Sequence, residues 1–185
     1  MNRTAYSIFI ILFLLSCKRN RTAYQFDQEL STKEQVSPTA KSSQELIPND
    51  KILSAKIIRI LDGDTVEILY NQLPIKLRLE HIDAPEKRGK QPFGNRAKII
   101  LSNLCFGQMV KIHSEGKFDR NGRLIGVIFN SKGLNINKEM VRLGMAWHYK
   151  KYSDDMSYDS IEKEARIAKV GLWKDPDAIA PWDFR

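Results

Sequence analysis

Residues 52–82 read ILSAKIIRILDGDTVEILYNQLPIKLRLEHI, and this stretch determines the fold. Residues 52–61 are rich in Ile and Leu, and residues 65–70 are rich in side chains that favour pleated strands. Asp-Gly-Asp at 62–64 is a turn signal between them. Residues 75–82 then alternate, with Leu77 and His81 on one face and Arg78 on the other. Three strands joined by short turns predict an antiparallel meander.

The rest of the chain extends this meander with helices and a second pair of strands. The spacing of apolar residues predicts a helix over 94–104, and strands are expected over 108–114 and 124–129, joined by the hairpin signal Asn-Gly. Two more helices are expected over 135–143 and 157–169, each with a glycine beyond its end. The order β-β-β-α-β-β-α-α predicts an α+β, mainly β fold: a five-stranded OB-like Greek-key barrel with three packed helices.

Charge and composition limit the classes of protein that fit. The chain has 185 residues, 42% hydrophobic and 28% charged, which suits one globular domain with a core of its own. The net charge is +8, and residues 1–50 contribute only +1, from six Lys/Arg against five Asp/Glu, so residues 51–185 carry +7. A basic domain suits a polyanionic partner such as nucleic acid or an anionic surface, although a basic soluble protein without such a partner has the same composition.

The N-terminus has the features of an export signal. Arg3 precedes an apolar run over 8–15 that is too short to span a bilayer and fits the core of a signal peptide. The run ends in Leu-Leu-Ser-Cys at 14–17, which resembles the bacterial lipobox, although Leu15 is a less common residue at its place. We therefore expect a signal peptide over 1–16, lipid on Cys17 and a membrane-anchored lipoprotein of the bacterial envelope. An ordinary secretory signal cut near the same point is the alternative and gives a secreted protein.

Residues 17–50 are expected to precede the folded domain, and the second cysteine is expected to lie inside it. Residues 18–50 are polar, with few large apolar side chains, and are interpreted as a flexible tether, so the folded domain is expected over 51–185. Cys105 lies in a helix-like stretch over 97–105, where a small buried apolar side chain is the favoured interpretation. Nothing in the cysteine pattern predicts a disulfide framework.

Three carboxylates stand at the ends of the expected strands. Asp64 belongs to the turn after the first strand, and Asp83 and Glu86 belong to the sequence IDAPE at 82–86. Each motif alone is typical of ordinary turns. Together they bring hard oxygen ligands to neighbouring strand ends, and such ligands suit Ca²⁺ or Mg²⁺ rather than zinc.

Two arginines are candidates for binding phosphate. Arg78 lies on the polar face of the third strand, and Arg123 follows the Asn-Gly turn. A guanidinium offers a planar fork that grips two phosphate oxygens, although surface arginines also pair with nearby acids for purely structural reasons. Residues five apart in a regular strand face opposite sides, so Arg78 and Asp83 share a site only if the strand bends or bulges between them.

The order of these motifs resembles the staphylococcal nuclease (thermonuclease) family. The resemblance rests on DGDT at 62–65, RL at 78–79, IDAPE at 82–86 and DRNGR at 119–123. It covers about residues 54–185 and continues through LGMAW at 143–147, GLW at 171–173 and PW at 181–182. Each piece is common alone, and the joint order and spacing carry the resemblance.

The resemblance implies a barrel with three helices and a calcium-dependent nuclease, with another hard divalent cation as an open alternative. The family's metal ligands fall on Asp64, Asp83 and the main-chain carbonyl of Ala84, where the family typically has Thr or Ala. Its catalytic glutamate falls on Glu86.

The same resemblance implies a substrate and a product. The family's phosphate-binding arginines fall on Arg78 and Arg123, and a nucleotide-stacking tyrosine falls near Tyr152, in a stretch that aligns less firmly. We expect a monomer that hydrolyses DNA, RNA or both with little sequence preference and leaves 3′-phosphate ends.

Other functions remain open from the sequence. A domain of this fold can bind nucleic acid or peptides without cleaving them, and the N-terminus alone also suits a surface-anchored adhesion protein. A histidine base is the rival mechanism, but no chemistry is assigned to the three histidines: His81 and His113 are expected as strand residues and His148 in a loop or groove edge.

Overall fold

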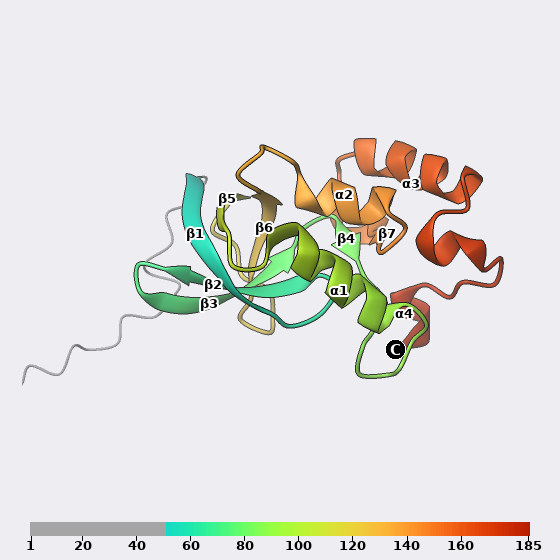
Figure 1. The fold of residues 1–185 in the computed structure, drawn as a ribbon, viewed down its shortest axis with the longest axis horizontal. Coiled ribbons are helices and arrows are strands. Elements are labelled where there is room, and N and C mark those ends of the chain that lie inside the picture. The colour runs from blue at the N-terminus through green and yellow to red at the C-terminus, as the bar shows by residue number, and fades with distance from the viewer. Residues whose placement is uncertain (1–50) are drawn as a thin grey trace, which may run out of the picture. The chain divides into compact units, whose positions relative to one another are not determined.

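A computed structural model describes residues 51–185, and the predicted signal peptide, Cys17 and the whole predicted tether lie outside the described residues. Within this part, five strands form a closed barrel in the order β1-β2-β3-β6-β5 (Figure 1). Their bounds are β1 Lys51–Ile60, β2 Thr65–Tyr70, β3 Leu73–Leu79, β5 Met109–Ser114 and β6 Leu124–Phe129. Strands β1, β2 and β3 form the predicted antiparallel meander. A parallel contact of β3 with β6 and an antiparallel contact of β5 with β1 close the barrel, which confirms the predicted five-stranded fold.

Alternation of buried and exposed side chains explains why these segments form a barrel. In β5, Val110, Ile112 and Ser114 point inward and are buried while the residues between them are exposed. Strand β6 buries Leu124 and Ile128 on the same period of two. The inward residues of all five strands meet in one continuous core.

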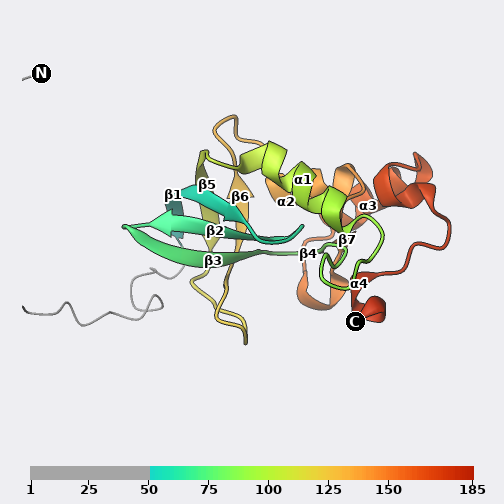
Figure 2. The same ribbon diagram turned by 60° about the horizontal axis from the view of Figure 1, so that its bottom comes forward.

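The three predicted helices are present: the first two pack on strands of the barrel, and the third packs on the second helix. Their bounds are α1 Gly94–Cys105, α2 Ile136–Arg142 and α3 Ser157–Ile167, with a further short helix α4 at Pro181–Phe184 and two 3₁₀ turns, η1 Lys150–Tyr152 and η2 Gly171–Lys174. In both views of the ribbon, α3 and α4 lie at the end of the molecule away from the β2–β3 hairpin (Figure 2). None of the helices within residues 51–185 is long and apolar enough to span a bilayer.

Cys105 is a buried residue at the end of α1, as predicted. Its thiol donates to the carbonyl of Leu101 at 3.2 Å, and burial raises its pKa to about 12. The side chain therefore acts as a small apolar group in the core.

The single strand predicted over 75–82 is wrong. Strand β3 ends at Leu79, and a turn at residues 80–81 separates it from β4 Ile82–Asp83, which pairs with β7 Trp147–His148. His81 adopts a positive φ of 68° in this turn. Its ring lies 4.9 Å from the ring of Tyr158, so it is not the strand residue that the alternation predicted.

Tertiary contacts impose this turn. The buried side chain of Asn137 in α2 donates to the carbonyl of Glu80 at 3.0 Å and accepts from the amide of Ile128 at 3.1 Å. Asn137 of α2 therefore fixes the point at which the chain turns away from the barrel after β3. His148, predicted in a loop or at a groove edge, lies in the short strand β7, where it is buried and lines a cavity beside Tyr149, and His113 lies in β5 as predicted.

Candidate active site

A tight turn before β2 positions Asp64. The amides of residues 61 and 62 both donate to the carbonyl of Thr65, at 2.9 and 3.0 Å. The Asp64 carboxylate accepts from the Thr65 hydroxyl through Oδ1 and from the Ala84 amide through Oδ2, both at 2.9 Å. Asp64 thus connects the turn before β2 with the chain that follows β4.

Glycine at position 63 allows this close approach. A Cβ at Gly63 would lie 2.8 Å from the Cβ of Ala84 and 2.8 Å from the Cβ of Ala97 in α1. Any larger residue would push the turn away from both neighbours. The glycine of the DGDT motif therefore has a packing role that the turn signal alone did not indicate.

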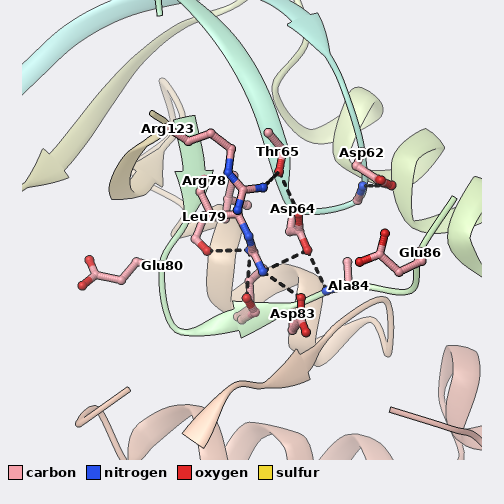
Figure 3. A network of polar contacts seen from close by, with 12 residues as sticks. Asp62, Asp64, Thr65, Arg78, Leu79, Glu80, Asp83, Ala84, Glu86 and Arg123 are labelled. Carbon is pink, nitrogen blue, oxygen red and sulfur yellow. Dashed lines mark hydrogen bonds and ion pairs between the residues drawn. The ribbon is translucent and has the colours of Figure 1, made fainter. Parts of the chain in front are cut away.

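Arg78 lies between the two aspartates (Figure 3). Its Nη2 is 2.8 Å from Asp83 Oδ1 and 3.2 Å from Asp64 Oδ2. Its Nη1 donates to the carbonyls of Leu79 and Ile82, at 3.0 and 2.9 Å. Because β3 ends at Leu79 and the chain turns, Arg78 and Asp83 share one site although they are five residues apart. The chain therefore bends between Arg78 and Asp83, as a shared site for the two residues requires.

Arg123 approaches the same cluster from the hairpin between β5 and β6. Asp119 holds it, with Nε at 2.7 Å and Nη2 at 2.6 Å from Oδ2. Its Nη1 donates to the hydroxyl of Thr65 at 3.3 Å, and that hydroxyl donates to Asp64. Arg123 is therefore linked to the aspartates through one side chain.

Glu86 lies in the loop between β4 and α1 and points back toward Asp64 (Figure 3). Its amide donates to Gln91 Oε1 at 2.8 Å, which shapes the loop. Its carboxylate pairs with Arg185 Nε at 2.9 Å, and Arg185 Nη2 lies 2.5 Å from Asp83 Oδ2. Burial raises the pKa of Glu86, and the charge of Arg185 opposes the rise.

The electrostatics of the cluster favour a bound cation. Burial, and next the charge of Asp64, raise the pKa of Asp83 to about 7 although Arg78 and Arg185 lie beside it. Within residues 51–185, no group of three or more His, Cys, Asp or Glu side chains is placed so that side chains alone could hold a metal ion. The donor set is two buried carboxylates beside a loop backbone, and hard cations accept such oxygen ligands and complete their shells with water or substrate oxygens. The residues therefore fit an open site for a hard divalent cation.

Comparison with known proteins identifies the family. Residues 76–175 match the sequence model of a family described as staphylococcal nuclease homologue. The chain belongs to the staphylococcal nuclease family. It is 43% identical over 141 residues to a micrococcal nuclease of Shigella flexneri, covering 70% of this chain and 79% of the relative. It is 38% identical over 133 residues to an uncharacterized endonuclease of Escherichia coli O157:H7, covering 72% and 85%, and 41% identical over 133 residues to one of Haemophilus influenzae, covering 71% and 72%.

Family membership confirms the resemblance on which the prediction rested, and it makes the protein a nuclease that hydrolyses nucleic acid. The structure brings the predicted Asp64, Arg78, Asp83, Glu86 and Arg123 together from separate segments. The individual roles of these residues, and that of the Ala84 carbonyl, stay predictions.

Tyr152, the predicted stacking residue, lies in η1 and is 63% exposed. Its ring meets the ring of Tyr149 edge-on at 4.9 Å, and Tyr149 stacks on Trp182 with centroids 5.2 Å apart. A cavity of about 470 Å³ beside these rings is lined by Tyr149, Trp182 and the basic residues Lys150, Lys151 and Arg166 among others. The structure therefore places Tyr152 in an aromatic and basic region, and its contact with a nucleotide stays a prediction.

Sequence reasoning missed four residues of this nuclease site: Thr65, Gln91, Asp119 and Arg185. Asp119 was accessible in principle, because it lies four residues before Arg123 across a hairpin turn. Arg185 gave no local signal, since its partner Asp83 is 102 residues away, and the bond from Gln91 to the Ile179 carbonyl likewise spans 88 residues.

Proposed function

We propose that the protein is a calcium-dependent nuclease that hydrolyses phosphodiester bonds in DNA, RNA or both with little sequence preference and leaves 3′-phosphate ends. The observation that carries the proposal is the position of Arg78, bonded at once to Asp64 and Asp83, with Glu86 joined to Asp83 through Arg185. Two carboxylates, a base and an arginine in contact form a set suited to phosphoryl chemistry.

Asp64, Asp83 and the carbonyl of Ala84 would hold the cation, Ca²⁺ or another hard divalent ion. When bound, such an ion acts as a Lewis acid on a non-bridging phosphoryl oxygen and reduces the repulsion between the phosphodiester and the attacking water. The pKa of Asp83 is raised first by burial and next by the charge of Asp64, and a cation between the two aspartates would offset both effects, which supports this assignment.

Glu86 would orient the attacking water and accept its proton. The Glu86 side chain is 29% exposed, so water reaches its carboxylate. A general base of this kind contributes roughly 10²- to 10⁴-fold to the rate.

Arg78 and Arg123 would bind the equatorial oxygens of the phosphoryl group. Both carry a fixed charge in a partly buried site, 13% and 26% exposed at the side chain, where a hydrogen bond to an anion is stronger than in water. Contacts that strengthen as charge develops in the five-coordinate transition state raise kcat rather than affinity alone.

Cleavage of defined oligonucleotides tests this proposal. Single-stranded DNA, duplex DNA and RNA are incubated with the full chain in Ca²⁺ or in EDTA, and the product ends are analysed by their sensitivity to a 3′-phosphatase. We expect Ca²⁺-dependent products that carry 3′-phosphates. Binding without cleavage in every metal would show instead a non-catalytic nucleic-acid-binding module, and 5′-phosphate ends would contradict the proposed 3′-phosphate products.

We also propose that the protein is exported as a monomer and anchored to the membrane by lipid on Cys17. The lipobox-like sequence at 14–17 supports this proposal. Labelled palmitate should be incorporated by the wild type and not by Cys17→Ala, and the variant should leave the membrane fraction. A Cys17→Ala protein that still partitions with membranes would contradict the anchor.

A further inference from the structure

Residues 179–185, which include α4, pack against the loop that carries Glu86. We call these residues the α4 segment. Gln91 joins the two: its Oε1 accepts from the Glu86 amide at 2.8 Å, and its Nε2 donates to the Ile179 carbonyl at 2.7 Å. Phe184 covers Gly89, where a Cβ would lie 2.7 Å from Phe184 Cε1.

The other side of the α4 segment is held by an aromatic stack. Trp182 lies parallel to Tyr149, with an angle of 3° between the rings and 5.2 Å between centroids. The Tyr149 amide donates to the carbonyl of His81 at 2.8 Å, directly before β4. The segment is therefore tied both to the Glu86 loop and to the chain next to Asp83.

Arg185, at the end of the α4 segment, bridges two carboxylates of the site. Its Nε lies 2.9 Å from Glu86 Oε1, and its Nη2 lies 2.5 Å from Asp83 Oδ2. Among residues 51–185, Arg185 is the only side chain that pairs with the Glu86 carboxylate. The guanidinium is 46% exposed while Asp83 is almost fully buried, so the arginine meets the cluster from its solvent side.

We propose that Arg185 is a positioning residue for the hydrolysis: it holds the Glu86 carboxylate in one orientation beside Asp83. The inference rests on the proposed function, because it assigns Arg185 a role through the base of that reaction. A partly exposed glutamate otherwise samples several rotamers, and a misplacement of about 1 Å in a catalytic group can cost about 10²-fold in rate. Lysine offers a point charge that reaches one carboxylate and cannot reproduce the planar bridge.

Steady-state cleavage of DNA at saturating Ca²⁺ tests the proposal, with the full chain as wild type, Arg185→Gln and Arg185→Lys. We expect kcat to fall about 10- to 100-fold in Arg185→Gln, as for other residues that orient a catalytic ligand. KM should stay within about twofold, and Arg185→Lys should recover part of the loss. Arg142→Gln is the matched control, since Arg142 is an exposed arginine that pairs with Glu139 away from the site.

A double-mutant cycle with Glu86→Gln separates positioning from other roles. If Arg185 acts through Glu86, Arg185→Gln changes the residual rate of the Glu86→Gln protein by less than about twofold. The proposal would be overturned if Arg185→Gln slows the Glu86→Gln protein as much as it slows the wild type. It would also be overturned if Arg185→Gln leaves the kcat of the wild type unchanged, whether or not KM rises. A wild type that does not cleave with Ca²⁺ would instead overturn the proposed function, so the two failures are distinguishable.

Discussion

Replacing Arg78 by glutamine should destabilise the metal-free protein strongly. The guanidinium is 13% exposed and bonds to Asp64, Asp83 and the carbonyls of Leu79 and Ile82. Glutamine cannot reach all four groups and carries no charge. The two buried carboxylates would then face each other with only Arg185 to compensate them.

Removing one partner of a buried ion pair typically costs about 3–5 kcal/mol in the free energy of unfolding. The loss should depend on pH through Asp83. Its pKa is raised in the folded protein from 3.8 to about 7, so the folded state binds this proton more tightly than the unfolded chain. The stability from Asp83 is complete below its unfolded pKa and is lost as pH rises through about 7. Because Arg78 lowers this pKa, the deficit of Arg78→Gln should be larger at pH 8 than at pH 6.

Urea unfolding of the full chain in EDTA, at pH 8 and pH 6, measures both effects. Arg59→Gln is the control, because Arg59 is 60% exposed and pairs with Glu67 on the surface, where a pair contributes less than about 1 kcal/mol. An Arg78→Gln protein that is no less stable than Arg59→Gln at pH 8, or whose loss of stability grows on acidification, would refute this role of Arg78.

Three further perturbations follow from the packing. Gly63→Ala should lower the free energy of unfolding by about 1–3 kcal/mol, because the new methyl group meets the Cβ of Ala84 at 2.8 Å; a thermal melt equal to the wild type would refute this contact. Asn137→Ala should cost about 1–3 kcal/mol and reduce cleavage, since the turn at Glu80 loses its buried donor, and unchanged stability in urea would contradict that role. Burial lowers the pKa of His148 below 6.5, so the stability that the neutral side chain contributes is present above pH 6.5 and is lost as pH falls. The melting temperature of His148→Gln should therefore fall less steeply below pH 6.5 than that of the wild type, and an equally steep fall would refute this role.

The barrel could be predicted because its signals are local. Residues 65–70 are rich in side chains that favour strands, and the strand observed there has the predicted bounds. The turn at residues 80–81 could not be predicted, because Glu80 and His81 continue the period of two. Contacts with Asn137, far along the chain, decide that β3 ends at Leu79.

The candidate site was predictable to the extent that its motifs have a recognisable order. Asp64, Asp83 and Glu86 lie in short motifs near strand ends, so sequence reasoning reached them. The bridge from Arg185 to Glu86 depends on the packing of the α4 segment, and no local pattern encodes a pairing across almost a hundred residues. Contacts between distant segments therefore account for what sequence reasoning missed.

The most direct test of the central claim is the rate of DNA cleavage by the wild type and by Glu86→Gln, each measured with Ca²⁺ and with EDTA. We predict that the wild type cleaves DNA only with Ca²⁺ and that Glu86→Gln loses about 10²-fold or more in rate with an unchanged urea midpoint. Cleavage that persists in EDTA, or a fully active Glu86→Gln protein, would contradict it.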